Sequence, residues 1–210
     1  MSPQPPSTSP HRHDVIVIGG GSAGYAAARV ARDAGADVAI VDYGPLGGLC
    51  ILRGCMPTKA ILRSAEVAAL MRRGPEFGLG ALTPPVDFSA IVDRKNRLVG
   101  EFSADRIAAL HDPKFTLYES RAEFLSPQEV RVGDERLTAG AFVIATGSIV
   151  SRVPIPGLEE AGYLTSDSAL ELRRPPASLL VLGGGPVAVE FAQFFARIGT
   201  AVTIVQRSAT

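Results

Sequence analysis

The chain has 210 residues with Lys+Arg 21 and Asp+Glu 21, so its formal net charge is zero. This balance argues against a general nucleic-acid binder, which needs an excess of basic charge. No apolar run reaches the roughly 20 residues of a membrane span, and the Pro- and Ser-rich N-terminus lacks the apolar stretch of a secretory signal. We therefore expect a cytoplasmic protein without nucleic-acid or membrane partners, with a disordered tail over residues 1–13.

The first patterned segment follows this tail. The apolar run Val15–Ile18 predicts a strand buried on both faces, and Ala23–Ala34 predicts a helix that stops near Gly35. Val38–Val41 is a second apolar run. Together these pieces predict a βαβ unit.

Helical periodicity returns in Lys59–Arg73 and in Ser89–His111, with a loop between them. From Phe115 to Phe142 the chain has short β-like pieces separated by turns, which predict an antiparallel meander. Ala141–Ser148 predicts another buried strand that ends in a glycine turn. The Pro- and Gly-rich segment 149–162 is typical of a connection between units.

The chain then repeats its opening plan. Ser178–Arg207 predicts a strand, a glycine-rich turn, a helix and a second strand. Because one βαβ unit cannot cover both faces of a parallel sheet, we expect the beginning of a domain whose remainder is absent. The predicted fold class is α/β: a Rossmann-like domain with a β-meander over residues 14–150, a connection over 151–177, and the first βαβ unit of a second, incomplete Rossmann-like domain over 178–210.

The first glycine cluster, GGGSAG from Gly19 to Gly24, fits G-x-G-x-x-G after a buried strand and at the start of a helix. Gly19 permits the tight turn, Gly21 lets backbone N–H groups approach a pyrophosphate, and Gly24 lets helix and strand pack closely. The helix N-terminus adds partial positive charge, and Asp42 can accept hydrogen bonds from ribose hydroxyls. A plain turn with packing glycines is the alternative, but the context favours dinucleotide binding. The predicted cofactor-binding positions are Gly19, Gly21, Ser22, Ala23, Gly24 and Asp42.

A second cluster, GGGPVA, begins at Gly183. Ala188 replaces the third glycine, which this motif tolerates. Gln206 and Arg207 stand at the end of the next strand, where an acid would favour NAD; Gln206 is neutral and Arg207 can meet a 2′-phosphate, so the pattern leans slightly towards NADP. A βαβ unit that binds nothing is the alternative. The predicted positions here are Gly183, Gly185, Ala188 and Arg207.

The segment GGLCILRGCMPTK, residues 47–59, contains both cysteines of the chain. Two dinucleotide folds that flank two cysteines suggest electron flow from a nicotinamide through a flavin to a disulfide. In a regular helix, residues five apart have Cα atoms roughly 8–9 Å from each other, whereas a disulfide needs about 7 Å or less. A bridge between Cys50 and Cys55 therefore requires a distorted turn, which Gly54 permits.

Two other roles for the cysteines are a metal site and inert buried thiols. A zinc site needs two further ligands, and the three histidines, His11, His13 and His111, form no cluster near the pair. Two inert buried thiols are the other alternative. Lys59 is either a surface helix lysine or a cation near a flavin, where it would lower a thiol pKa.

These motifs together resemble the flavin-dependent pyridine nucleotide–disulfide oxidoreductases, which include dihydrolipoamide dehydrogenase, mercuric reductase and glutathione reductase. The cysteine segment is similar to their signature G-G-T-C-x-N-x-G-C-x-P-S-K. The stretches GGGSAG, VIATGS, PIPG and GGGPVAVEFA follow in the order and rough spacing of the family. The resemblance covers nearly everything from Asp14 to Arg207.

The resemblance implies FAD and NAD(P)H as cofactors and a role for each matching residue. It makes Cys50 the interchange thiol, which attacks the substrate, and Cys55 the charge-transfer thiolate against the flavin ring. It places Lys59 near flavin N5, in an ion pair with Glu190 that we expect to be buried. The backbone at Ala122 would contact the adenine. The other implied cofactor contacts are Gly48, Cys50, Thr146 and Gly147.

The sequence also departs from the family. Leu49 and Leu52 replace the usual Thr and Asn, which removes polar contacts to the flavin phosphates and the redox helix. Family chains are more than twice as long, and their C-terminal dimerisation domain supplies a catalytic His–Glu pair across a homodimer. No counterpart of that domain is present here, so dimerisation cannot be inferred from the resemblance.

The predicted function is an FAD-dependent NAD(P)H:disulfide oxidoreductase in cell redox homeostasis, dihydrolipoamide dehydrogenase-like as the first choice. Electrons would pass through the Cys50–Cys55 disulfide to a small-molecule or protein-bound disulfide. The alternatives are a mercuric reductase-like enzyme acting on Hg(II), another disulfide reductase, and a catalytically incomplete FAD-binding fragment. A flavin monooxygenase or amine oxidase would share the first glycine cluster but would need neither the cysteines nor the second cluster.

Overall fold

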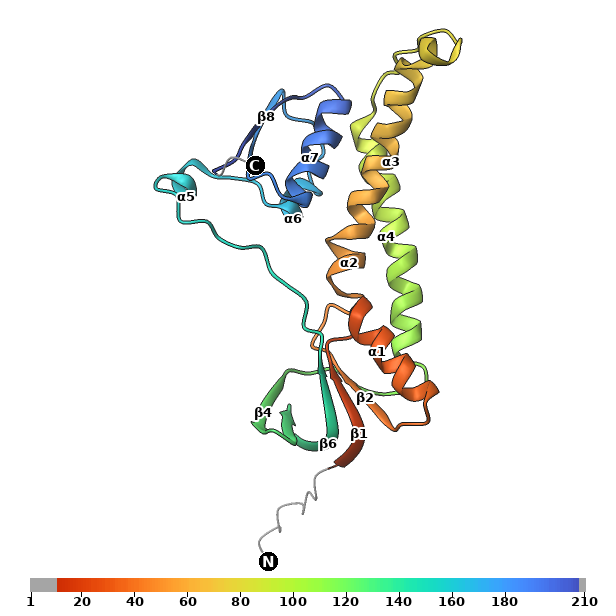
Figure 1. Ribbon diagram of the computed structural model, residues 1–210, viewed down its shortest axis with the longest axis vertical. Helices are drawn as coiled ribbons and strands as arrows, with labels where there is room; N and C mark the ends of the chain where they lie inside the picture. The colour runs from red at the N-terminus through yellow and green to blue at the C-terminus, as the bar shows by residue number, and fades with distance from the viewer. Residues whose placement is uncertain (1–10, 208–210) are drawn as a thin grey trace, which may run out of the picture. The chain divides into compact units, whose positions relative to one another are not determined.

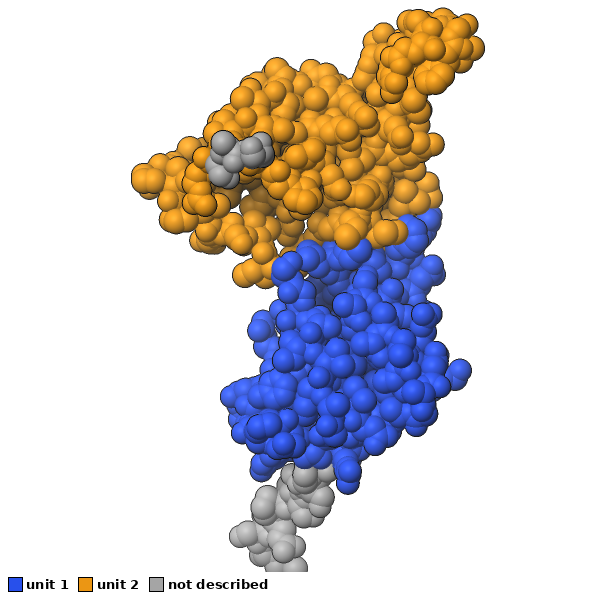
Figure 2. All heavy atoms as spheres, in the orientation of Figure 1, with its two compact units in different colours: residues 1–51, 101–148 blue, residues 52–100, 149–210 orange. Residues whose placement is uncertain are grey.

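The computed structural model describes residues 11–207 and divides the chain into two compact units (Figures 1 and 2). Unit 1 comprises residues 1–51 and 101–148, and unit 2 comprises residues 52–100 and 149–210. The prediction placed residues 52–100 in one domain with residues 14–51 and 101–150, whereas the two compact units group them with the C-terminal part. The domain boundaries themselves stay a prediction.

Unit 1 contains a six-stranded sheet with the strand order β3-β2-β1-β6-β5-β4. Strands β3, β2, β1 and β6 run parallel, and β5 and β4 continue the sheet in antiparallel fashion. The predicted βαβ unit is present as β1, α1 and β2. The bounds are β1 His11–Ile18, α1 Ser22–Asp33, β2 Val38–Val41, β3 Thr116–Tyr118, β4 Ala122–Ser126, β5 Glu129–Val132 and β6 Glu135–Ile144.

Three strand predictions need correction. Residues 11–13, expected in a disordered tail, belong to β1; the rest of that tail, residues 1–10, lies outside the described residues. The piece at Thr116–Tyr118, expected in the antiparallel meander, pairs parallel to β2. The two strands expected around Gly140 form one continuous strand, because β6 pairs with the extended β1 from His11↔Leu137 to Ile18↔Ile144.

Both faces of β2 and of the second half of β1 are covered, which explains why Val38–Val41 and Val15–Ile18 are apolar runs. The end of β6 was predicted to be buried as well, but it is only partly covered, and Ile144 is 69% exposed. On one face Ile16 and Val41 pack against Val130 and Leu137 of the meander. On the other face the strands pack against α1 and the end of α4, through Ala28 and Leu110 among others. The carboxyl ends of β1, β2, β3 and β6 are thereby held at one edge of the sheet, where ligands bind in open α/β folds.

Unit 2, drawn in orange in Figure 2, is built on helices that pack against a second βαβ unit, β7-α7-β8. Its core combines Ile61 and Ala65 of α3 with Phe88 and Val92 of α4 and three phenylalanines of α7. This shared core is the physical reason why residues 52–100 group with the C-terminal part. The bounds are α3 Cys55–Arg72, η1 Gly74–Phe77, α4 Phe88–Leu110, α5 Leu158–Ala161, α6 Ser166–Ala169, β7 Ser178–Leu182, α7 Pro186–Arg197 and β8 Ala201–Val205, with α2 Gly48–Leu52 preceding them.

The two-stranded sheet of unit 2 is covered on one face. Leu179 and Val202 pack towards the core that α7 shares, whereas Leu180, Leu182 and Ile204 are exposed. A single helix shields only one side of this sheet, as expected for one βαβ unit. Among the described helices, none is both long enough and apolar enough to span a membrane.

Candidate cofactor and redox site

The first glycine turn, which follows β1, lies in contact with the ends of β2 and β6 in unit 1. Gly19 has φ +106° and its N–H donates to the Val41 carbonyl over 2.7 Å. A Cβ at this position would lie 2.2 Å from the carbonyl oxygen of Ala145, so only glycine fits. The turn therefore lies at the carboxyl ends of β1, β2 and β6 at once, beside the predicted position Thr146.

Gly24 brings helix α1 against this turn. A Cβ on Gly24 would lie 1.7 Å from the carbonyl oxygen of Gly19, which leaves no room for any side chain. This is the close helix–strand packing that the motif requires of its third glycine. Contact of Gly24 and its neighbours with a cofactor stays a prediction.

The glycine turn also touches the cysteine segment. Gly48, at the start of α2, has φ +75°, and a Cβ there would lie 2.5 Å from the Cα of Gly21. Gly48 and Gly21 are thus packed backbone to backbone. The segment that carries the cysteines begins directly on the turn predicted to bind a pyrophosphate.

The N-terminus of α1 suits an anionic group. Among the described residues, no side chain forms a cap hydrogen bond to α1 at Gly21. By contrast, Thr165 and Ser168 cap the short helix α6 with a complete capping box. The first-turn N–H groups of a helix need an acceptor, and a phosphate supplies one. The residues present therefore fit the pyrophosphate of a dinucleotide.

Asp42 has a structural role that the sequence prediction missed. Its Oδ2 accepts a hydrogen bond from the Gly20 N–H over 2.7 Å, and its Oδ1 accepts one from the Gly44 N–H over 2.8 Å. The second bond closes a local turn of the Asp-x-Gly type. This short motif is the one signal in the sequence for the structural role of Asp42. Each carboxylate oxygen retains a lone pair, so Asp42 can hold the turn and still accept a ribose hydroxyl.

The second glycine turn repeats the geometry of the first. Gly183 has φ +109°, and its N–H donates to the Val205 carbonyl over 2.8 Å. Helix α7 begins after Gly185 with no side-chain cap hydrogen bond among the described residues, and a Cβ at Gly183 or Gly185 would meet open space. Gly183 and Gly185 are thus not demanded by packing against the described residues, unlike Gly24.

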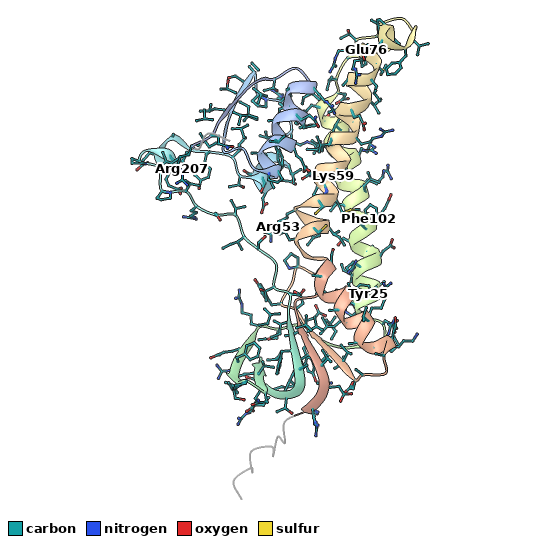
Figure 3. All side chains as sticks on the ribbon, in the orientation of Figure 1. Tyr25, Arg53, Lys59, Glu76, Phe102 and Arg207 are labelled. Carbon is teal, nitrogen blue, oxygen red and sulfur yellow. The ribbon has the colours of Figure 1, made fainter. Side chains whose placement is uncertain are left out.

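Gln206 occupies the place that Asp42 has in the first turn. An added Cβ on Gly184 would lie 1.6 Å from Gln206 Oε1, so the Gln206 amide rests directly on the turn. Arg207, the last described residue, is exposed beside it (Figure 3). The acceptor position of this turn therefore carries a neutral side chain followed by a cation.

The helix is broken between the two cysteines. Helix α2 ends at Leu52 and α3 begins at Cys55, and Gly54 has φ −119° and ψ −113°, outside the helical region. This is the distorted turn that the spacing of the cysteines demands. Cys50 is half-buried and Cys55 is exposed. The disulfide itself stays a prediction.

Thr58 anchors the start of α3 just after the break. Its hydroxyl donates to the Gly54 carbonyl over 2.7 Å, and its N–H donates to the same oxygen over 3.2 Å. The Thr58 side chain is buried. It therefore fixes the orientation of the helix turn that presents Cys55, a role that sequence reasoning did not assign.

Lys59 and Glu190 form a hydrogen-bonded ion pair between α3 and α7. The pair is not buried as expected, since the Lys59 side chain is 59% exposed and the Glu190 side chain 34%. The cause is helix geometry: Phe191 points into the shared core, and the preceding residue, about 100° around the helix, lies at the edge of that core.

Further polar links hold α3 and α4 to the C-terminal part of unit 2, and none was predicted. Lys95 is 2% exposed and donates to the Leu170 carbonyl and to Glu171 Oε1, each over 2.9 Å. In the turn between the cysteines, the Nη1 atom of Arg53 lies 3.4 Å from Oδ2 of Asp167. These contacts join residues more than 70 positions apart in the sequence, so no local sequence pattern predicts them.

The predicted site residues fall into two sets. Unit 1 contains the first glycine turn, Asp42, Gly48, Cys50, Ala122 at the start of β4, and Thr146 and Gly147 after β6. Unit 2 contains Cys55, Lys59, Glu190 and the second glycine turn with Gly183, Gly185, Ala188 and Arg207. Within residues 11–207, no three His, Cys, Asp or Glu side chains gather in a group able to hold a metal ion.

Comparisons with known proteins give a consistent result. The model of the family described as pyridine nucleotide-disulphide oxidoreductase matches residues 13–210. Mercuric reductase of Staphylococcus aureus is 38% identical over 93% of this chain and 36% of its own length. Dihydrolipoyl dehydrogenase of Acholeplasma laidlawii is 36% identical over 92% of this chain and 59% of its own length.

A solved structure is also similar. The Cu(II) complex of a mutant of the HOCl-induced flavoprotein disulfide reductase RclA from Escherichia coli has a TM-score of 0.80 and 29% identity, over 95% of this chain and 43% of that one. The chain thus spans less than two thirds of the length of these relatives. Its fold is Rossmann-like α/β, and it belongs to the pyridine nucleotide–disulfide oxidoreductase family.

Proposed function

We propose that this chain is the redox core of an FAD-dependent NAD(P)H:disulfide oxidoreductase of the dihydrolipoamide dehydrogenase type. The observation that carries this proposal is the backbone packing of Gly48 on Gly21: a Cβ added to Gly48 would lie only 2.5 Å from the Cα of Gly21. It joins the segment with Cys50 to a turn shaped for a dinucleotide pyrophosphate. The second glycine turn then serves NAD(P)H.

The residues of unit 1 would hold FAD in a defined way. The N–H groups of Ser22, Ala23 and Gly24 at the uncapped start of α1 would bind the pyrophosphate, and Asp42 would accept a hydrogen bond from the adenosine ribose. The bound cofactor would supply two-electron chemistry between the nicotinamide and the disulfide. Thr146 and Gly147, which follow β6 beside Gly19, line the same edge of the sheet.

The two cysteines would then exchange electrons with the substrate. The Cys50 thiolate attacks one sulfur of a substrate disulfide, forming a mixed disulfide and releasing the first substrate thiolate, which takes up a proton. The Cys55 thiolate next attacks Cys50, which releases the second substrate thiolate and re-forms the Cys50–Cys55 disulfide. The break of the helix at Gly54 gives the chain the turn that this bridge needs.

The ion pair on α3 and α7 has a supporting role in this proposal. Lys59 lies one helical turn after Cys55, so it would place a positive charge on the face of α3 that carries the thiol. Glu190 holds the lysine side chain in place through the hydrogen bond between them. The partial exposure of both groups limits the strength of this interaction, because water screens it.

A second candidate acceptor is a thiophilic metal ion such as Hg(II). The specific observation is that mercuric reductases reach 38% identity with this chain, against 39% for the dihydrolipoyl dehydrogenase of Chlorobaculum parvum. Two vicinal thiolates bind soft metal ions well. Anaerobic reduction of both the flavin and the disulfide, followed by oxidised lipoamide or Hg(II), separates the two. Lipoamide as the true acceptor would yield dihydrolipoamide and the re-formed Cys50–Cys55 disulfide, whereas Hg(II) would yield Hg(0) and the absorbance of oxidised flavin.

A visible spectrum tests the proposal directly. We expect the 210-residue chain incubated with FAD and freed of excess ligand to be yellow, and to develop a long-wavelength charge-transfer band on anaerobic titration with dithionite or NADPH. A protein that stays colourless after this incubation contradicts FAD binding. A yellow protein that takes up only the electrons of its flavin contradicts the redox-active disulfide.

The nicotinamide preference is expected to depend on Arg207. Replacing Arg207 with Glu removes the cation that would meet the 2′-phosphate, so the dissociation constant for NADPH should rise by roughly ten- to hundredfold, as expected for a charge-assisted hydrogen bond worth about 1.5–3 kcal/mol. NADH binding should change much less. Arg174→Glu, which makes the same charge change at another exposed residue of unit 2, is the matched control. An unchanged ratio of NADPH to NADH affinity in Arg207→Glu would show that this residue does not read the phosphate.

A further inference from the structure

The turn between the two cysteines is tied to a distant short helix of unit 2. Arg53 and Gly54 separate the end of α2 from the start of α3 at Cys55. The Nη1 of Arg53 donates to Oδ2 of Asp167 in α6 over 3.4 Å, although the two residues are 114 positions apart in the chain. The turn that leads into Cys55 therefore has a tether outside the two helices that it joins.

The helix at the other end of this tether is fixed to the core of unit 2. Its first turn is held by the capping box of Thr165 and Ser168. At its C-terminal end, Leu170 is 4% exposed and belongs to the same buried cluster as Ile61 of α3. The Asp167 carboxylate thus projects from a helix whose position is set by burial, whereas Arg53 lies in a break between helices.

A buried lysine secures α6 further. Lys95 of α4 is 2% exposed, and its Nζ donates to the Leu170 carbonyl and to Glu171 Oε1, each over 2.9 Å. An ammonium group leaves water at a high cost unless its hydrogen bonds are replaced, and here the end of α6 replaces them. An apolar residue of similar size would fill this place without that cost. Core packing alone therefore does not account for a lysine here, but the fixing of α6 does.

From this arrangement we infer that Arg53 and Asp167 are positioning residues for the two thiols: their ion pair holds the broken turn in a conformation from which Cys50 and Cys55 can form a disulfide. The inference rests on the proposed function, because it presumes that these cysteines are a redox pair. A loose turn must lose conformational freedom before the bridge closes, and a turn that is already held loses less. The ion pair therefore favours the disulfide over the dithiol.

The test is the equilibrium between dithiol and disulfide in the full 210-residue chain, set by anaerobic glutathione buffers. One oxidised glutathione takes two electrons from the two cysteines, and the products are the protein disulfide and two reduced glutathione molecules, which retain the two protons. Remaining thiols are alkylated and counted by mass. For Arg53→Gln and for Asp167→Asn we expect the equilibrium constant for disulfide formation to fall by about two- to fivefold, the range set by an exposed ion pair. The double variant should fall no further, because both changes remove the same contact.

A direct effect of the two charges on the thiols would give a different result. A cation near a thiol favours the thiolate and a carboxylate opposes it, so Arg53→Gln would then raise the constant while Asp167→Asn lowers it. Opposite shifts, or no shift in either single variant, overturn the positioning role and leave the redox pair of the proposed function intact. If the unmodified chain forms no Cys50–Cys55 disulfide at any glutathione ratio, the proposed function is wrong as well.

Arg73→Gln and Glu76→Gln are the control variants. Arg73 and Glu76 form another exposed ion pair of unit 2, with 2.6 Å between Nη2 and Oε2. Glu76 and Arg53 lie near opposite ends of α3 (Figure 3). Neither control should change the constant. A fall as large as that in Arg53→Gln would show that the loss of any surface pair has this effect, and it would overturn the inference.

Discussion

Cys55→Ser is expected to eliminate the charge-transfer band of the reduced protein while FAD binding is retained. Cys55 begins α3 directly after the broken turn, and its position is set by Gly54 and by the Thr58 hydroxyl, neither of which depends on the thiol. Serine is nearly isosteric and keeps the helix start, so the fold and the flavin site should persist. Without a thiolate at residue 55 the disulfide cannot form, and two-electron reduction of the protein should stop at the flavin.

Cys50→Ser provides the matched comparison for this experiment. It removes the half-buried cysteine of α2 and should retain the band, since the thiolate at residue 55 is still present. Exchange with a substrate disulfide should be lost in both variants, because each lacks one of the two sulfurs that the reaction needs. The measurement is an anaerobic reductive titration followed in the visible range, with thiols counted after denaturation. A band that survives in Cys55→Ser and vanishes in Cys50→Ser would reverse the assigned roles.

Gly24→Ala is expected to be the most destabilising small substitution in the first glycine turn. The added Cβ would lie 1.7 Å from the Gly19 carbonyl oxygen, and that atom belongs to a turn that is itself held by hydrogen bonds. Relief requires α1 to move off the sheet. Overpacking of this kind costs about 1–3 kcal/mol or more, so the free energy of unfolding should fall by at least that amount. FAD binding should fall with it.

Gly100→Ala is the control for that substitution. Gly100 lies inside α4, is exposed, and has open space where the Cβ would stand. Alanine there should stabilise the protein by about 0.5–1 kcal/mol, because it reduces the entropy of the unfolded chain. Urea denaturation of both variants, followed by circular dichroism, checks the pair. A Gly24→Ala protein as stable as the unmodified chain would contradict the close packing of α1 on the turn.

The structure distinguishes two reasons why glycine occurs in the G-x-G-x-x-G motif: close packing of the backbone and an unusual backbone conformation. Gly19 and Gly24 are required by packing, since a Cβ at either would collide with backbone atoms. Gly183 and Gly185 have open space around the missing Cβ. In the second turn only the backbone conformation at Gly183, with φ +109°, and the approach of a ligand explain the choice. The same sequence pattern thus reflects different constraints at the two sites.

Local patterns in the sequence were sufficient for much of the fold and of the candidate site. The βαβ unit around Gly19, its repeat around Gly183 and the break between Cys50 and Cys55 all follow from residues within one or two turns of each other. Apolar runs, helical periodicity and glycine positions are patterns within such short stretches, so they can be recognised from the sequence alone. The family resemblance added the pairing of Lys59 with Glu190, which no local pattern gives.

The pairing and packing of segments that are distant in the sequence could be seen only in the three-dimensional structure. It paired β3 with β2, joined the two pieces of β6 along β1, and placed Lys95 under Leu170 and Glu171. It also gave Asp42 its bond to Gly20 and laid Arg121 over Tyr43. Each of these depends on contacts between residues more than 20 positions apart, whose geometry is set by the packing of whole strands and helices. A local sequence determines which elements can form, but their partners are chosen by the burial that the complete chain achieves.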